Sequence, residues 1–165
     1  AIDFGIQGWG KTDLVFASYK KEPVLVGYFT LANKYIRISS KFLNKHSSSL
    51  RRRISKFAPF DRDLEAYILS APLIAQLGKN YTNDYNKLIT GDDLLIEACD
   101  RISRIQFDLG GRFAYVECED KEILKDFYKR NGFCEFDKRT LDPDETEKLD
   151  GNYLVQLLKY IRKGK

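Results

Sequence analysis

Hydrophobic and polar positions change period several times along the 165 residues. Two apolar runs rich in β-branched and aromatic residues, 13–21 and 24–32, flank a charged turn and predict an antiparallel hairpin. From Ser39 to Phe57 the apolar positions recur at helical spacing, which predicts an amphipathic helix with a break near the serines 47–49. Residues 1–12 hold three glycines and no clear period, so we expect a loop or a truncated first element there.

The middle of the chain predicts a strand, a long polar loop and a helix. Residues 66–78 are typical of a strand that is interrupted or bulged at Pro72, because proline cannot donate to a sheet ladder. The polar segment that follows is long for an ordinary connection between a strand and a helix. Thr90 and Asp93 have the spacing of a capping box, with Asp in place of the usual Glu, so the helix is predicted to begin near Thr90.

The last third predicts a strand, a short helix and two more strands. Residues 112–119 are apolar and β-rich, and Asp120 is the predicted N-cap of the helix that follows. Asn131 and Gly132 are expected to end that helix. Its predicted apolar face consists of Ile123, Leu124, Phe127 and Tyr128. With strands at 133–141 and 153–161, the order of elements predicts one α/β layered domain over residues 1–165, with a mixed sheet flanked by helices.

Composition fits a soluble globular domain. Hydrophobic residues make up 43% of the chain and charged residues 32%, which excludes the low-hydrophobicity class of disordered proteins. No segment is apolar enough to cross a bilayer, and the first residues lack the pattern of a signal peptide, so we expect a cytoplasmic protein without a membrane partner. The absence of methionine indicates a lost initiator or a chain cut from a longer one.

The cysteines and the single histidine add little chemistry. Cys99, Cys118 and Cys134 are odd in number, show no C-x-x-C spacing and lie in apolar runs, so they are expected to be small reduced core residues. We predict no disulfide framework and no metal site. His46 lies in a Lys/Ser-rich stretch and is expected at the surface. No role can be argued for Trp9 or for the acidic loop after Leu141.

The net charge of +4 is mild, and the basic residues cluster mainly at Arg51, Arg52 and Arg53. A solvated helix face is favoured there over a nucleic-acid or acidic-partner surface.

The predicted helix start near Thr90 could bind a phosphate. The first N–H groups of a helix have no intrahelical partner and sit at the positive end of its dipole. Gly91 allows close backbone approach, and Lys87 and Lys79 add positive charge. Asp92 and Asp93 would repel a phosphate unless their side chains point away from it. Taken alone, the pattern favours an ordinary capped helix.

Two stretches in the expected order resemble the GNAT N-acetyltransferase superfamily. The octapeptide DFYKRNGF, residues 126–133, holds the complete F-Y-x-x-x-G-F signature: Phe127, Tyr128, Gly132 and Phe133. The pyrophosphate loop Q/R-x-x-G-x-G/A is degraded, since only Gly91 matches while Lys87, Leu88 and Ile89 replace its usual residues. GYFTLA and LGK, which precede the loop, are similar to the toxin-type branch. The resemblance covers about residues 13–161, with the N-terminal part missing or divergent.

This resemblance implies a mostly antiparallel sheet with a V-shaped cleft between its two central strands. Acetyl-CoA would lie there without a metal, its pantetheine arm on the backbone of Asn80, Tyr81 and Thr82. Its pyrophosphate would meet Lys87 and the N–H groups of Leu88, Ile89, Thr90, Gly91 and Asp92.

The implied reaction is acetyl transfer to a primary amine by direct attack. Tyr128 would protonate the leaving thiolate, since a phenol stays protonated at neutral pH. From periodicity alone, a packed aromatic residue is the better interpretation of Tyr128. Glu117 and Glu119 share one face of their strand and are the candidate general bases, although solvated carboxylates fit them equally.

The acceptor stays open between a small molecule, a protein amine and an aminoacyl-tRNA, and a homodimer is allowed. A different class of function fits the degraded loop: a non-catalytic module that binds acyl-CoA or nucleic acid on the same fold.

Overall fold

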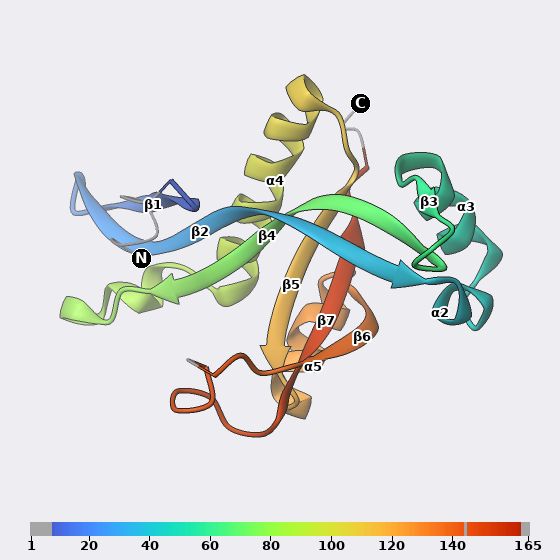
Figure 1. Cartoon of the computed structure of the whole chain (residues 1–165). Coiled ribbons are helices and arrows are strands. Elements are labelled where there is room, and N and C mark those ends of the chain that lie inside the picture. The colour runs from blue at the N-terminus through green and yellow to red at the C-terminus, as the bar shows by residue number, and fades with distance from the viewer. Residues whose placement is uncertain (1–7, 144, 163–165) are drawn as a thin grey trace.

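The computed structural model describes residues 8–143 and 145–162. Its sheet has the strand order β1-β2-β4-β5-β7-β6, with the short β3 paired to β4, and only β4 and β5 run parallel (Figure 1). The strands are β1 (Gly10–Tyr19), β2 (Glu22–Ser39), β3 (Phe60–Asp61), β4 (Ala66–Lys79), β5 (Phe113–Glu119), β6 (Cys134–Thr140) and β7 (Tyr153–Tyr160). The helices are α2 (Ser40–Asn44), α3 (Ser48–Phe57), the 3₁₀ helix η1 (Thr82–Leu88), α4 (Gly91–Leu109) and α5 (Glu122–Arg130). The predicted mixed, mostly antiparallel sheet flanked by helices is confirmed.

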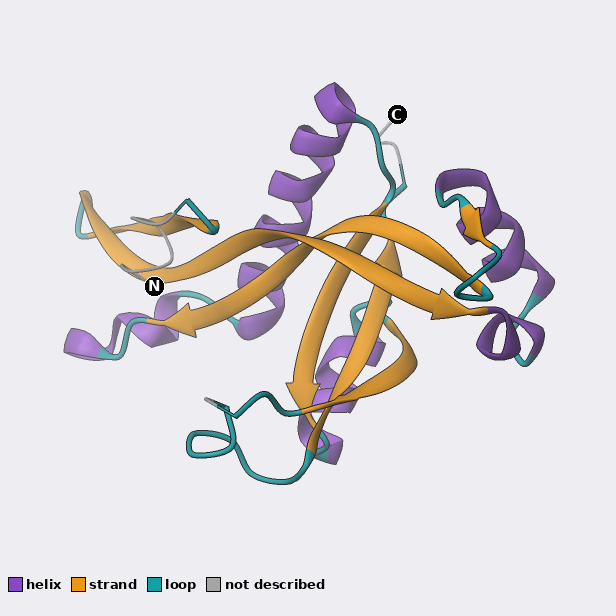
Figure 2. Cartoon of the chain, viewed as in Figure 1, coloured by secondary structure: helices purple, strands orange, loops and turns teal. Residues whose placement is uncertain are grey.

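The sheet carries a separate hydrophobic core on each face. α4 and α5 pack on one face, where their apolar side chains meet Val116 and Cys118 of β5. α2 and α3 pack on the other face against Phe113 and Tyr115, which alternate with the first pair along the same strand. Figure 2 shows α4 and α5 beside the central strands and α2 and α3 grouped beyond the end of β2. β5 is therefore covered on both faces.

The N-terminal hairpin is confirmed, with different bounds. β1 begins at Gly10, inside the segment that the pattern assigned to a loop, and residues 1–7 lie outside the described residues. β2 extends to Ser39 instead of ending near residue 32, because its second half keeps a buried face through Ile36 and Ile38. The register of β2 on β4 runs the whole way to Ser39.

The irregular point of β4 is displaced from Pro72. Pro72 keeps its place in the register opposite Asn33, and the shift falls at Ala75, between the pairs Leu31–Ile74 and Thr30–Gln76. A strand residue directs its N–H toward one neighbour only, and β4 shares a single pair with β5. A proline in β4 can therefore be tolerated without a break in its ladder with β2.

The predicted break in the basic helix is confirmed. α2 ends at Asn44 and α3 begins at Ser48, and the hydroxyl of Ser47 accepts a hydrogen bond from the N–H of Leu50. The helix is split because this serine caps the second segment.

Two predictions about α5 are wrong. Its N-cap is Lys121, because the carboxylate of Asp120 is held by Lys125, Lys138 and Tyr153. Ile123 is 77% exposed, so it does not belong to the packed face of the helix, and Leu124, Phe127 and Tyr128 form that face.

Cys99 and Cys118 are buried free thiols, as predicted, whereas Cys134 is exposed at the start of the edge strand β6. Among the described helices, none has the length and apolar composition that a membrane crossing requires. Residues 8–143 and 145–162 also contain no group of His, Cys, Asp and Glu suited to a metal ion.

Candidate active site

A gap opens between the two parallel central strands. β4 and β5 share one register pair, Leu73 with Tyr115, and beyond it β4 stays with β2 while β5 stays with β7. Figure 1 shows the ends of β4 and β5 diverging from their crossing point. In the described part of the chain, no strand pairs with the β5-facing edge of residues 74–79. Backbone groups of that edge are available to an extended ligand, as in β-strand addition.

The start of α4 lies directly after this open edge and η1. The hydroxyl of Thr90 accepts a hydrogen bond from the N–H of Asp93 at 3.1 Å, and the Asp93 carboxylate accepts one from the N–H of Thr90 at 3.0 Å. The capping box predicted with Asp is confirmed. The N–H groups of Gly91 and Asp92 are in the first turn, where no intrahelical acceptor exists. They form the positive end of a helix of 19 residues.

Both acidic side chains at this helix start are bound by protein groups. Arg130 donates two hydrogen bonds to the Asp92 carboxylate, at 2.9 and 3.1 Å, and Asn131 donates a third at 2.6 Å. These bonds, led by those of Arg130, lower the pKa of Asp92 to about 2. Hydrogen bonds from Thr90 likewise lower the pKa of Asp93. Arg130 therefore compensates the negative charge of Asp92, whereas the hydrogen bonds to Asp93 come from the neutral Thr90.

The loop before α4 differs from a glycine cradle. It forms η1, in which Asn83 and Asp84 take left-handed backbone angles, with φ of 52° and 61°. The ammonium of Lys87 lies 2.8 Å from the Asp84 carboxylate, and both side chains are exposed. Ile89 is partly buried against the core under α4, and Leu88 is exposed.

Two of the three residues predicted for the pantetheine arm use their N–H groups internally. The N–H of Asn80 donates to the carbonyl of Val26 at 2.8 Å, and the N–H of Thr82 donates to the side chain of Asn80 at 3.0 Å. Tyr81 is 74% exposed. The open backbone edge therefore comes just before Asn80, at residues 74–79, which sequence reasoning did not identify.

Tyr128 lies in an apolar wall next to the start of α4. Its ring centroid is 5.0 Å from that of Phe127 and 5.7 Å from that of Phe133, both in edge-on contacts. A Cβ added at Gly91 would come within 3.3 Å of the Phe127 ring, so the α4 start and the Tyr128 helix touch at a glycine. The two motif stretches therefore meet through Gly91 and Phe127.

Burial raises the pKa values of Tyr128 and of the nearby Cys118. Desolvation, with a smaller contribution from Cys118, raises the pKa of Tyr128 to about 12. Desolvation also raises the pKa of the Cys118 thiol to about 11. Within the described residues the Tyr128 hydroxyl has no hydrogen-bond partner. The raised pKa means that this phenol is protonated at neutral pH.

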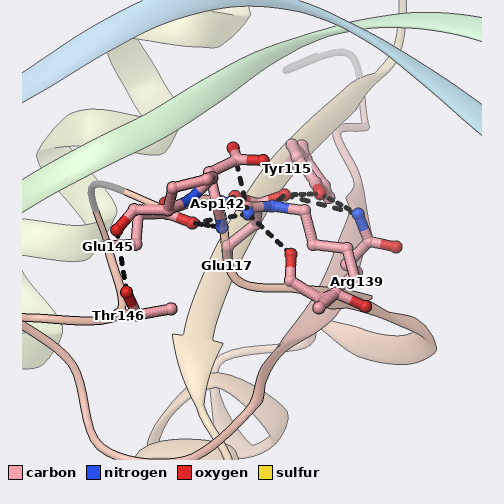
Figure 3. Close-up of polar contacts among 9 residues, drawn as sticks. Tyr115, Glu117, Arg139, Asp142, Glu145 and Thr146 are labelled. Atoms are coloured by element: carbon pink, nitrogen blue, oxygen red, sulfur yellow. Dashed lines mark hydrogen bonds and ion pairs between the residues drawn. The ribbon is translucent and has the colours of Figure 1, made fainter.

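Glu117, a candidate base, is at the centre of a polar network (Figure 3). Arg139 grips both of its oxygens, with nitrogen–oxygen distances of 2.7 and 2.8 Å, and Tyr115 and Gln156 donate to it as well. The other side of the Arg139 guanidinium binds Glu145 at 2.7 Å. Burial raises the pKa of Glu117, but the bonds from Arg139 and Tyr115 outweigh it and leave the pKa lowered.

Glu119 is less enclosed. Its carboxylate lies 3.1 Å from the Lys121 ammonium and accepts a hydrogen bond from the N–H of Asp150. It shares a face of β5 with Glu117, as predicted from their spacing. Cys118, in the same core cluster as Tyr128, lies on the opposite face. The structure does not gather Tyr128 and the two glutamates on one face of the sheet.

Comparisons with known proteins show the fold. No model of a known protein family matches the sequence, and no curated protein matches it either. Among solved structures, the toxin AtaT complexed with acetyl-methionyl-tRNAfMet superposes with a TM-score of 0.57 and 15% identity, over 93% of this chain and 74% of AtaT. A tyrosine-to-phenylalanine variant of KacT superposes with a TM-score of 0.56 and 16% identity, over the same shares.

A tyrosine-to-phenylalanine variant of AtaT gives a TM-score of 0.53 at 12% identity, over 81% of this chain and 64% of AtaT. The chain thus spans roughly two thirds to three quarters of the length of these toxins. The chain has the fold of the toxins AtaT and KacT, so the GNAT-like fold predicted from the two motif stretches is confirmed.

Proposed function

We propose that this protein transfers an acetyl group from acetyl-CoA to a primary amine, with Tyr128 as the proton donor to the leaving thiolate. The observation that carries the proposal is the continuity of three features: the open edge of β4, the capped start of α4, and the unpartnered Tyr128 hydroxyl. The edge of β4 leads through η1 to the start of α4, and Phe127, the neighbour of Tyr128 in sequence, contacts that start at Gly91. Each feature would suit a different part of one ligand.

The residues present fit acetyl-CoA, which would supply the activated acetyl group. Residues 74–79 would pair with the amides of the pantetheine arm like an added strand. The N–H groups of Gly91 and Asp92 would meet the pyrophosphate. AtaTR, a protein of the same fold, has been solved with acetyl-CoA bound.

Tyr128 would hold its proton until a thiolate forms beside it. Its raised pKa keeps the phenol protonated at neutral pH. A phenol and a thiol have ordinary pKa values of about 10 and about 8.5, so the leaving thiol would be close enough to Tyr128 in acidity to exchange a proton.

The amine would attack in its neutral form. Glu117 could accept the amine's proton only by giving up a bond from Arg139 or Tyr115. Glu119, held by one lysine and one backbone N–H, is the freer of the two candidate bases. Because Glu119 lies on the face of β5 opposite to the Tyr128 cluster, we propose that the amine's proton passes to Glu119 only through water, or directly to solvent.

For the acceptor we propose an aminoacyl-tRNA. Arg51 and Arg52 are exposed on α3. The Arg53 guanidinium lies over the ring of Tyr160, 4.6 Å from its centroid, so α3 presents a basic surface beside the sheet. AtaT has been solved with acetyl-methionyl-tRNAfMet. Phosphate contacts by such a helix provide affinity without reading sequence.

The test is thiol release from acetyl-CoA with aminoacyl-tRNA and with a panel of small and peptidyl amines, for wild type and Tyr128→Phe. We expect turnover with at least one acceptor and a loss of roughly 100-fold in kcat for the variant. Undiminished turnover by Tyr128→Phe would exclude the donor role.

One set of observations favours a non-catalytic acyl-CoA-binding module instead. The helical η1 replaces the glycine loop, and Glu117 is locked in an ion pair. Binding of CoA without turnover on any amine would support this alternative.

A further inference from the structure

The end of α5 is held to the start of α4 by residues at the variable positions of the F-Y-x-x-x-G-F signature. Arg130 forms a two-point contact with the Asp92 carboxylate, and Asn131 adds a hydrogen bond to the same group. The Arg130 guanidinium also lies over the Phe127 ring, 5.1 Å from its centroid. The residues that hold Asp92 therefore lie two and three positions after Tyr128 in the sequence.

The position of Asp92 makes its charge important. A carboxylate in the first turn stabilises a helix, but it opposes any phosphate that binds the same N–H groups. Among the two lysines near this loop, Lys87 is already paired with Asp84. Arg130 is a cation fixed at the helix start by hydrogen bonds, and its planar fork matches the carboxylate.

We propose that Arg130 is a positioning residue for the cofactor's diphosphate: it binds the Asp92 carboxylate from the end of α5 and offsets its negative charge at the start of α4. This inference rests on the proposed binding of acetyl-CoA at that helix start. It explains how a loop without the usual glycines could still accept a diphosphate, because the compensating charge comes from α5.

The test is a double-mutant cycle with Arg130→Ala, Asp92→Asn and the double variant, read out as CoA affinity by calorimetry. Removal of Arg130 alone leaves the Asp92 carboxylate with its hydrogen bond from Asn131 but without its cation, so we expect CoA affinity to fall about tenfold. Asp92→Asn should bind CoA as tightly as wild type or more tightly. The double variant should recover affinity to within about threefold of wild type, because residue 92 then carries no charge for Arg130 to offset.

A second substrate distinguishes an effect of the Arg130 charge on the diphosphate from a purely structural effect of Arg130 on the start of α4. S-acetylpantetheine lacks the diphosphate, so its KM should be the same in all four proteins. Arg130→Lys keeps the charge without the fork and should fall between wild type and Arg130→Ala. Lys129→Ala is the matched control, since Lys129 faces Glu135 of β6 at 3.3 Å, and it should bind CoA like wild type.

The outcomes distinguish this inference from the proposed function. Failure of wild type to bind CoA overturns both. Binding by wild type with equal affinity in Arg130→Ala overturns the role of Arg130 alone. Equal losses of CoA affinity in both single variants and the double variant, with a raised KM for S-acetylpantetheine, would show that the contact between Arg130 and Asp92 only supports the fold and would overturn the inference.

Discussion

At the scale of single residues, the surroundings of Tyr128 set the expected pH dependence. Its folded pKa is raised from the usual value to about 12, so the protonated, donating form persists as pH rises. The acceptor amine loses its proton over the same range and becomes a better nucleophile. We therefore predict that kcat/KM rises with pH and stays on a plateau up to about pH 10. A steady-state profile with a descending limb beginning near pH 9 would contradict this environment for Tyr128.

Glu117 gives the second prediction at this scale. Its side chain is 8% exposed and its ion pair with Arg139 is partly buried, so Glu117→Gln leaves the guanidinium without one of its anions. We expect the free energy of unfolding in urea to fall by about 2 kcal/mol. Glu119→Gln, on the same strand face, alters a weaker contact and should cost less than about 1 kcal/mol. Equal, small effects would show that the Arg139 network adds little to stability.

At the scale of elements, the loop between β6 and β7 is tied down by Glu145. Its carboxylate binds Arg139 at 2.7 Å and the N–H of Asp142 at 2.9 Å. Arg139, chiefly, lowers the folded pKa of Glu145 to about 2, below its unfolded value. The tie is therefore fully present above about pH 4.5 and is lost as pH falls toward 2.

We predict that Glu145→Gln loosens this loop at neutral pH. Trypsin should then cleave after Lys148 severalfold faster than in wild type, because proteolysis follows the population of the open loop. Glu147→Gln removes an exposed charge from the same loop and serves as the control. If both variants are cut at the wild-type rate, Glu145 does not fasten the loop.

Local patterns predicted most elements, because their signals are local. The serines that split α2 from α3, the Thr90 capping box and Gly132, with φ of 84°, each act on their own turn. The prediction that Asp120 caps α5 is wrong because its side chain is bound instead by lysines of α5 and β6. A competing long-range contact of that kind leaves no mark in the periodicity.

At the scale of the whole molecule, the sequence predicted the V between β4 and β5 only through a family resemblance. The single parallel pair that creates it, Leu73 with Tyr115, depends on register between segments about 40 residues apart. The ion pair between Asp92 and Arg130, which are 38 residues apart, could not be predicted from the sequence pattern for the same reason. Tyr128 could be singled out because its signature is contiguous in the chain.

The charge distribution gives the prediction about the acceptor. Arg51 and Arg52 are exposed on α3, whereas Lys20 and Lys21 lie in the β1–β2 turn at the other end of the sheet (Figure 1). In gel shifts with tRNA, we expect replacement of both arginines by alanine to weaken binding and to lower the salt slope by about two. Replacement of both lysines should change neither quantity. Equal effects of the two pairs would contradict a binding surface at α3.

The central claim is that acetyl-CoA lies along the open edge of β4 and meets the start of α4. Hydrogen exchange measured by mass spectrometry, with and without saturating CoA, tests it most directly. We predict slower exchange in peptides covering residues 74–79 and 88–92, where free N–H groups would gain acceptors, with no change in the β1–β2 turn. Unchanged exchange in both of those segments at a CoA concentration that saturates binding by calorimetry would contradict the account.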